Sequence, residues 1–475
     1  MARKKPFEII FERLIANSGI VTTLLLIVGY CGIALLPALE RPIHFDEKAL
    51  VAGAAAPSSR MQPPSVLQDG LRFASAVGQQ YGQPGSADLV ADHMEKQLGM
   101  VSHRSGSTHP DGGGGDFGAG AALVMGVAST LMAHLSTVHW LAKDIVWLVP
   151  DSSCGGSLNA TMQWVAAYGL GQHLSRRSDA HVSDFSGRAG LMQQAIVLES
   201  ASAGYNRVEV LLESFNGQLP KLDMYQLLRY FSAWQHGRLV LTGDRPLPAW
   251  LLAWLQGGAV QVYLQKVYTV YQLIWRQALG GPVGPHAAFK SVMVDAVTLR
   301  LELQDGQQPV YQDLQTAIPH LVDTLELVIR SLNNLVERVH HSFSLYLQTD
   351  IAHFVPVEVY IILPVALVAA LLLQVAVHAQ RLQQQPPTAS DTDADAAPAA
   401  TPSHLATKSS ASHHKQLSAA TAALELCMAA IILAAMSCVN WALAYSVAAL
   451  ATPCLLLRYM RSSSEQTLMV KNHQR

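Results

Sequence analysis

The stretch RVEVLLESFNGQLPKLDMYQLLRYF, residues 207–231, passes from one kind of secondary structure to another within a few residues. Its first seven residues are rich in Val and Leu, which is typical of a strand buried on both faces. Asn216-Gly217 predicts a turn because both residues accept a positive φ, and Pro220 suits the start of the apolar-periodic helix that follows. The stretch contains no catalytic constellation, so it indicates architecture rather than chemistry.

Two earlier runs, KDIVWLV (143–149) and QQAIVLE (193–199), have the same apolar character and are also predicted to be buried strands. Strands that alternate with helices indicate an α/β sandwich with a mostly parallel sheet, and the region is long enough for one large core. Stretches with helical periodicity alternate with these strands: 118–135, 158–170, 221–234, 250–279 and 312–347.

The composition indicates a protein that is partly in a membrane and partly in water. Of the 475 residues, 50% are hydrophobic and 14% are charged, too apolar for a wholly soluble chain and too polar for a bundle of spans. Gly19–Leu39 has no charged residue, and its length as a helix, about 31 Å, is enough to cross the hydrocarbon core. Basic residues before it, including Lys4 and Arg13, place the N-terminus in the cytosol, so we expect an uncleaved signal anchor.

Two later apolar stretches predict further spans, four in all. Arg381 follows the first stretch, as expected if that span returns the chain to the cytosol. The second is about twice as long as one span needs and has basic residues on both flanks, which favours a hairpin of two spans. The predicted order is a cytosolic N-terminus (1–18), a signal anchor (19–39), a lumenal domain (40–353), a span (354–377), a disordered cytosolic linker (378–416), the hairpin (417–457) and a cytosolic tail (458–475).

Several functions have little support in the sequence. A net charge of -2 provides no basic field, so no nucleic-acid partner is expected. The run 112–115, GGGG, lacks the strand and the Lys-Ser/Thr of a phosphate loop. Cys154 stands apart from the other cysteines, which lie in apolar runs, so no disulfide framework is predicted. The sequon at Asn159 predicts glycosylation on the translocated side.

Four segments together resemble the attachment (Gaa-type) subunit of GPI transamidase. They are HWLAKDIVWLVPD (139–151), ESFNGQLPKLDMYQLLRYF (213–231), VDAVTLRL (294–301) and LNNLVERVHHSFSLYLQTDIAHFVPVEVYI (332–361). The segment CVNWALAYSVAALATP (438–453) is similar to the family's next membrane hairpin. The resemblance covers the signal anchor, most of the lumenal domain and the second span.

This resemblance implies a multi-pass protein of the endoplasmic reticulum membrane with a large lumenal domain. GPI transamidase cleaves a C-terminal signal from a precursor protein and joins that precursor to a glycosylphosphatidylinositol (GPI). In it, a caspase-like subunit supplies the cysteine nucleophile. The Gaa-type subunit is expected to be non-catalytic, to bind or present the GPI lipid and to contact the other subunits. Its lumenal domain is similar to di-zinc aminopeptidases.

The similarity to aminopeptidases implies a set of candidate metal ligands: Asp116, Asp151, Glu199 and His286. Carboxylates with imidazole suit Zn²⁺, but the position of the general base is Pro150, which has no proton-accepting side chain. No catalytic cofactor is therefore expected, and a bound zinc or other divalent ion would have a structural role. The alternative is that these acids are helix caps, solvated strand ends or the remains of a degenerate metal site.

Two further predictions concern lipid and histidine. Asn440-Trp441 lies at the predicted lumenal tip of the hairpin, where a GPI headgroup would sit and where Trp is favoured. His340-His341 is expected on a solvated face of the helix 312–347 rather than in a metal site. The competing function is a membrane-tethered zinc aminopeptidase or cyclase-like enzyme.

Overall fold

The computed structural model describes residues 16–51, 57, 63–80, 86–98, 117–150, 156–170, 190–234, 239–243, 245–255, 257–303, 313–383, 424, 427–437 and 440–473. The described residues form two compact units. The described residues of Glu40–Arg276 and Gly280–Pro356 form what we call the α/β unit. Those up to Leu39, the short helical segment Gln277–Leu279 and those from Val357 onward form the helical unit.

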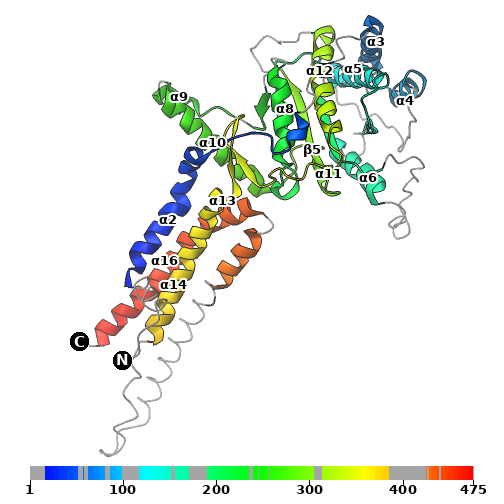
Figure 1. Ribbon diagram of the computed structural model, residues 1–475. Helices are drawn as coiled ribbons and strands as arrows, with labels where there is room; N and C mark the ends of the chain where they lie inside the picture. The colour runs from blue at the N-terminus through cyan, green and yellow to red at the C-terminus, as the bar shows by residue number, and fades with distance from the viewer. Residues whose placement is uncertain are drawn as a thin grey trace, which may run out of the picture. The chain divides into compact units, whose positions relative to one another are not determined.

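The α/β unit is built on a four-stranded sheet (Figure 1). The pairs β2–β5 and β3–β4 are parallel, whereas β3–β5 is antiparallel, so the sheet is mixed. The α/β class is confirmed, as are strands within 193–199 and 207–213; the aminopeptidase-like arrangement stays a prediction. The strands, in sheet order, are β2 (Gln194–Ser200), β5 (Asp295–Glu302), β3 (Arg207–Leu211) and β4 (Leu239–Leu241).

The two faces of this sheet differ in chemistry. Val297, Leu299 and Leu301 of β5 lie in register with apolar residues of β2 and β3, and these side chains belong to the main hydrophobic core. The alternate residues of β5, among them Thr298 and Arg300, point to the other face because side chains alternate along a strand. One face therefore holds the core, and the other carries the polar groups.

Helices cover both faces. The main core also takes in α5 (Phe117–Leu135), α8 (Leu222–Trp234) and α12 (Leu314–Asn333). Outside them, α3 (Pro64–Gln80) packs on α5, and α4 (Ser86–Lys96) packs on α3. On the polar face, α6 (Gly156–Leu170) and α11 (Ala287–Lys290) form a smaller core with Ala296 of β5. Helices at 118–135, 158–170 and 221–234 are thus confirmed.

Three predicted elements need correction. The stretch 250–279 is two helices, α9 (Ala249–Leu255) and α10 (Ala259–Leu279), because Gly257 and Gly258 take φ of +88° and +96° between them. The predicted helix 312–347 ends at Asn333, and the remainder is loop and strand. Residues 143–149 form no strand, and their side chains are half-buried or exposed rather than buried on both faces. Lys143 Nζ donates a hydrogen bond to the carbonyl oxygen of Leu332 at 3.0 Å. The segment is held by side chains rather than by ladder hydrogen bonds.

A second, antiparallel sheet was not predicted. It has the order β1-β7-β6, with β1 at Arg41–Pro42, β6 at Tyr346–Gln348 and β7 at His353–Pro356. Arg41 pairs with Phe354, and Tyr346 pairs with Pro356. The sheet joins the residues that follow Leu39 to those that precede Val357.

The helical unit contains two apolar helical stretches long enough to cross a membrane, Ser18–Leu39 and Val357–Val377. The first combines α2 (Ser18–Leu35) with the 3-10 helix η1 (Leu36–Leu39); the second combines α13 (Val357–Tyr360) with most of α14 (Ile362–Gln383). Two shorter apolar helices, Cys427–Ser437 and Trp441–Leu457, fall within the predicted hairpin, the latter being the start of α16 (Trp441–His473). Four spans therefore stay a prediction, and residues 384–416 of the predicted linker lie outside the described residues.

The helices of this unit approach each other at small residues. A Cβ added to Gly29 would lie 2.4 Å from Leu367 of α14, so α2 and α14 are in close contact there. The hydroxyl of Tyr445 on α16 donates to the carbonyl oxygen of Gly29 at 2.8 Å. Gln374 Nε2 donates to Thr22 Oγ1 at 2.7 Å. Close backbone contact with a few interhelical hydrogen bonds is typical of helices packed in a membrane.

Candidate functional site

Of the four predicted metal ligands, Asp116 and Asp151 lie outside the described residues. Glu199, near the end of β2, is hydrogen-bonded by Arg300 of the neighbouring strand: Nε and Nη2 donate to Glu199 Oε2 at 3.2 and 3.1 Å. The guanidinium thus already balances the negative charge of this carboxylate. The assignment of Glu199 as a ligand stays a prediction.

His286 lies just before α11 and is completely buried. Its Nδ1 is 2.9 Å from Thr298 Oγ1. Burial lowers the pKa of His286 to about 4, against the weaker effect of the carbonyls of Leu212 and Glu213, so the imidazole is neutral at neutral pH. Thr298 and Arg300 are two residues apart on one face of β5, so His286 and Glu199 lie over that same face. The structure brings these two predicted residues to one region, each engaged by another side chain.

Around Arg300 the polar face of the sheet carries alternating charges. Arg300 Nη1 is 3.6 Å from Glu209 Oε2, and Arg207 Nε is 3.2 Å from Glu302 Oε2. Glu209 Oε1 also accepts a hydrogen bond from the backbone N–H of Gly243 at 2.8 Å. Burial and the nearby Glu209 raise the pKa of Glu302. We call Glu199, Glu209, Glu302, Arg207 and Arg300 the sheet charge cluster; its acids are compensated by arginines.

The turn that opened the sequence analysis forms the entry to α8. Asn216 takes a φ of 56°, and its backbone N–H donates to the carbonyl oxygen of Gly280 at 3.0 Å. Tyr346 of β6 donates its hydroxyl hydrogen to the carbonyl oxygen of Pro220 at 3.0 Å. Leu222 N donates to the carbonyl oxygen of Phe343 at 2.8 Å. The segment therefore holds the chain around 343–346, which agrees with an architectural role.

Asp223, in the first turn of α8, is fully buried and accepts two further backbone hydrogen bonds. They come from Asp46 at 3.0 Å and from Glu47 at 2.8 Å. Asp223 N in turn donates to Ser342 Oγ at 2.9 Å. Burial raises the pKa of Asp223, while the two amides act in the opposite direction. The side chain thus joins the segment that follows η1 to α8.

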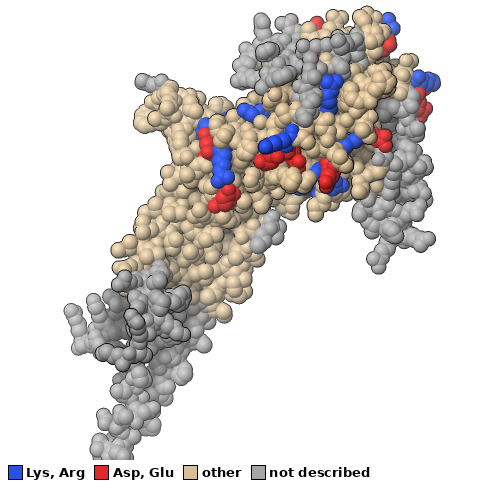
Figure 2. All heavy atoms as spheres, in the orientation of Figure 1, with Lys and Arg blue, Asp and Glu red and all other residues tan. Residues whose placement is uncertain are grey.

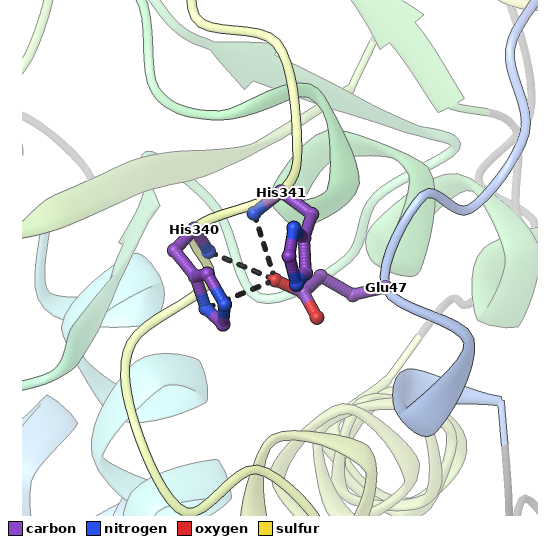
Figure 3. A group of neighbouring side chains, drawn as sticks. All are labelled: Glu47, His340 and His341. Carbon is purple, nitrogen blue, oxygen red and sulfur yellow. Dashed lines mark hydrogen bonds and ion pairs between the residues drawn. The ribbon is translucent and has the colours of Figure 1, made fainter.

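Glu47 continues this network, as Figure 3 shows. Its Oε1 accepts hydrogen bonds from the backbone N–H groups of His340 and His341, both at 2.9 Å, and lies 3.4 Å from His340 Nδ1. Burial favours protonation of Glu47, but the amides and imidazoles bring its pKa below the usual value. We call Glu47, His340 and His341 the Glu47 latch. The two histidines lie in a loop rather than on the predicted helix, because α12 ends at Asn333.

The Glu47 latch is one of two groups among the described residues whose ligand atoms are close enough to hold a metal ion. Glu with two His is a donor set that suits Zn²⁺. However, Glu47 Oε1 is already used by two amides, and His340 Nδ1 also lies 3.1 Å from the carbonyl oxygen of Arg338. The geometry therefore explains the group as a hydrogen-bonded connection between two segments.

The second group is Glu40, Asp350 and His353. Lys266 of α10 bonds to Glu40, and its Nζ lies 2.9 Å from Asp350 Oδ2. Asp350 also lies 2.9 Å from His353 Nδ1. The ammonium of Lys266 takes the place that a bound cation would occupy, so this cluster attaches α10 to the ends of the small sheet.

Asn440 and Trp441, the predicted lipid contacts, start α16 in the helical unit. Asn440 Nδ2 donates to the carbonyl oxygen of Gln277 at 2.7 Å, and Oδ1 accepts from Leu443 N at 3.0 Å as a helix cap. The ring of Trp441 lies 4.4 Å from that of Tyr360 between centroids. The amide of Asn440 is therefore used within the protein, and lipid contact by this pair stays a prediction.

The predicted glycosylation site is on α6. Asn159 is exposed, whereas Thr161 of the sequon is buried and donates to the carbonyl oxygen of Ser157 at 2.7 Å. The position is accessible at the asparagine, and its modification stays a prediction.

Together these features define an α/β domain connected to apolar, membrane-type helices. Its described polar clusters mainly tie segments of the chain to one another. The family model Gaa1-like, GPI transamidase component, matches residues 118–409, and the chain belongs to this family.

Two curated relatives show the same similarity over shorter regions. The chain is 28% identical over 176 residues to the GPI transamidase component gaa1 of Schizosaccharomyces pombe, covering 36% of this chain and 28% of the relative. It is 28% identical over 215 residues to the GPI transamidase component GAA1 of Saccharomyces cerevisiae, covering 44% of this chain and 30% of the relative. The aligned region thus spans less than a third of each relative.

Proposed function

We propose that this chain is a non-catalytic subunit of GPI transamidase that binds the GPI lipid and partner subunits in the endoplasmic reticulum membrane. The observation that carries the proposal is the family match, which runs from α5 through the sheet and the apolar stretch Val357–Val377. Both relatives are themselves named as components of GPI transamidase. We infer that the α/β unit is lumenal and that the caspase-like subunit of the complex supplies the nucleophile.

The arrangement of the sheet supports a non-catalytic role. Pro150 stands where an aminopeptidase has its general base, and proline cannot accept a proton from water. Glu199 is bound to Arg300, and His286 is buried against Thr298. To activate water, these groups would have to exchange their present partners for a metal ion.

The way in which the α/β unit is attached supports a positioning role. β1 follows the apolar stretch Ser18–Leu39, and β7 precedes Val357–Val377, so the small sheet ties the unit to both candidate spans. Asp223 and Glu47 add hydrogen bonds between the segment after Leu39 and the body of the unit. A body held near the membrane in this way is suited to present a lipid headgroup or a precursor protein to another subunit.

The test is complementation with purification. A tagged copy of the full chain, expressed in cells that lack their own Gaa-type subunit, should restore a GPI-anchored surface marker and co-purify with the caspase-like subunit. The purified chain alone should show no chelator-sensitive amide hydrolysis. Peptide hydrolysis that disappears with a chelator would support the enzyme alternative, and absence of both rescue and co-purification would overturn the proposal.

A further inference from the structure

The helices α9 and α10 carry an exposed apolar surface that no described contact covers. On α9, Trp250 and Trp254 are 73% and 76% exposed, and their spacing of four residues puts them on one face of the helix. On α10, Tyr271, Trp275 and Leu279 repeat the same spacing and are 53%, 52% and 69% exposed. We call these five side chains the apolar strip.

The α9 part of the strip lies in an uncharged part of the chain, whereas α10 carries Lys266 and Arg276. From Pro246 to Gln265 there is no Asp, Glu, Lys or Arg. In Figure 2 the projecting end formed by α9 shows no charged side chain among its described residues. The opposite side of α10 is buried, with Val270, Leu273 and Ile274 inside the protein. Large aromatic side chains that are exposed together on neighbouring helices mark a surface that contacts another apolar phase.

Two contacts join α10 to residues that flank apolar helices in the sequence. In its middle, Lys266 bonds to Glu40, which directly follows the apolar stretch Ser18–Leu39. At its end, the carbonyl oxygen of Gln277 accepts a hydrogen bond from Asn440, which precedes the apolar helix Trp441–Leu457. The two contact points are joined by about 16 Å of continuous helix. Both contacts therefore join α10 to a residue that is next to an apolar helix in the sequence.

We propose that the apolar strip lies in the interfacial layer of the membrane that the candidate spans cross. It would contact the glycerol region and the first carbons of the lipid acyl chains. Trp and Tyr are the side chains that prefer this layer, because one part of the ring system is apolar and another forms hydrogen bonds. An amphipathic helix that lies in this plane needs no specific polar partner. The inference rests on the proposed membrane location of the chain.

A bilayer fits the strip better than a protein partner does. Lys266 in the middle of α10 and Gln277 near its end both contact residues that flank apolar helices, as expected if the strip lies at the level where those helices leave the hydrocarbon core. Gly257 and Gly258, both with positive φ, separate α9 from α10.

The test uses tryptophan fluorescence of the full chain in liposomes of phosphatidylcholine brominated near the glycerol end of its acyl chains. Bromine quenches only those rings that enter the lipid. The double variant W250F/W254F should lose a quenchable share of the emission, so the ratio of intensity in plain and brominated lipid should fall toward 1. The matched control is Trp164→Phe, since Trp164 stacks on Tyr168 within the α/β unit. This control should leave the ratio near the wild-type value.

An unchanged ratio in W250F/W254F would overturn the inference. A second experiment identifies the occupant in native membranes: a photoreactive benzoylphenylalanine at position 254 should form adducts with lipid, and the same probe at Val336, 93% exposed in the α/β unit, should not. A protein adduct at 254 as the main product would contradict the inference in favour of a partner subunit.

Extraction of the same samples with alkaline carbonate tests whether the candidate spans are inserted in the membrane. This result does not depend on where the apolar strip lies. A chain that resists extraction but shows no quenching at the strip overturns only this inference. A chain that is extracted overturns the membrane location itself.

Discussion

Glu199 on the sheet and Glu47 in the latch are both engaged carboxylates, but different kinds of group hold them. Glu199 is bound by the half-exposed side chain of Arg300, whereas Glu47 is 8% exposed and accepts hydrogen bonds from two backbone N–H groups. A side-chain partner can turn to water when the carboxylate is lost. Backbone donors in a fixed loop cannot, so they stay unsatisfied. The nature of the partner therefore decides how much each carboxylate contributes to stability.

The largest effect is expected from Glu47→Ala. Both amides, of His340 and His341, lose their acceptor, and at 1–3 kcal/mol for each unsatisfied donor we expect about 4 kcal/mol of destabilisation. Glu47→Gln keeps one acceptor oxygen and is the matched control, with less than half of that loss. The measurement is urea denaturation of the full chain in detergent, followed by fluorescence. Equal losses in the two variants would mean that charge, not the hydrogen bonds, stabilises the loop.

The pH dependence of stability tests whether the imidazole of His286 is buried and neutral on the polar face of the sheet. The pKa of His286 is about 4 in the folded chain against an ordinary value of 6.5, so the unfolded chain binds more protons between these values. The contribution of His286 to the free energy of unfolding is fully present above pH 6.5. It is lost as the pH falls toward 4, by roughly 3 kcal/mol in all. His286→Gln, which stays uncharged, should flatten this part of the stability curve. A curve of unchanged slope would show that other groups cause the acid sensitivity.

Asp223→Asn should have an intermediate effect. The remaining side-chain oxygen of the asparagine still accepts one hydrogen bond from the backbone. Its NH₂ group faces the other N–H, that of Asp46 or Glu47, and cannot accept, so one hydrogen bond is lost. We expect about 2 kcal/mol, seen as a lower thermal midpoint. Limited proteolysis adds a positional readout, because cleavage near residue 46 should become faster than in the wild type. Unchanged cleavage there would contradict the role of Asp223 in holding this segment.

The smallest effect is expected from Glu199→Gln. A half-exposed ion pair contributes roughly 0–1 kcal/mol, and Arg300 keeps Glu209 as a partner. The thermal midpoint should therefore shift by no more than a few degrees. A loss as large as that of Glu47→Ala would remove the distinction between side-chain and backbone partners.

The sequence predicted the elements whose patterns are local. The Val- and Leu-rich runs became β2 and β3, and the periodic stretch after Pro220 became α8. The run 143–149 has the composition of a strand but pairs with none among the described residues, because pairing depends on a distant neighbour that composition does not encode. The helix that ends at Asn333 was predicted to be too long, because the helical periodicity of the sequence continues beyond the point where the chain leaves the helix and leads to β6.

The candidate site was less predictable for a similar reason. Neither Glu47 nor Asp223 stands out in the sequence, because each acts by accepting hydrogen bonds from residues far away in the chain. The only local signal is Asp223 in the first turn of a helix, where an acid is favoured. Glu199 and His286 were placed over one face of the sheet by the fold, but their partners Arg300 and Thr298 come from β5, which only the strand order brings beside β2.

The small sheet has a consequence for biosynthesis. Arg41 emerges from the ribosome early, yet its pairing partner Phe354 is made only after nearly all of the α/β unit. A contact between such distant residues forms late, because a long loop must close first. β1 therefore stays unpaired until β7 has been made. The small sheet would therefore form only at the end of synthesis of the α/β unit. A chain truncated before residue 353 would leave β1 unpaired and accessible to chaperones.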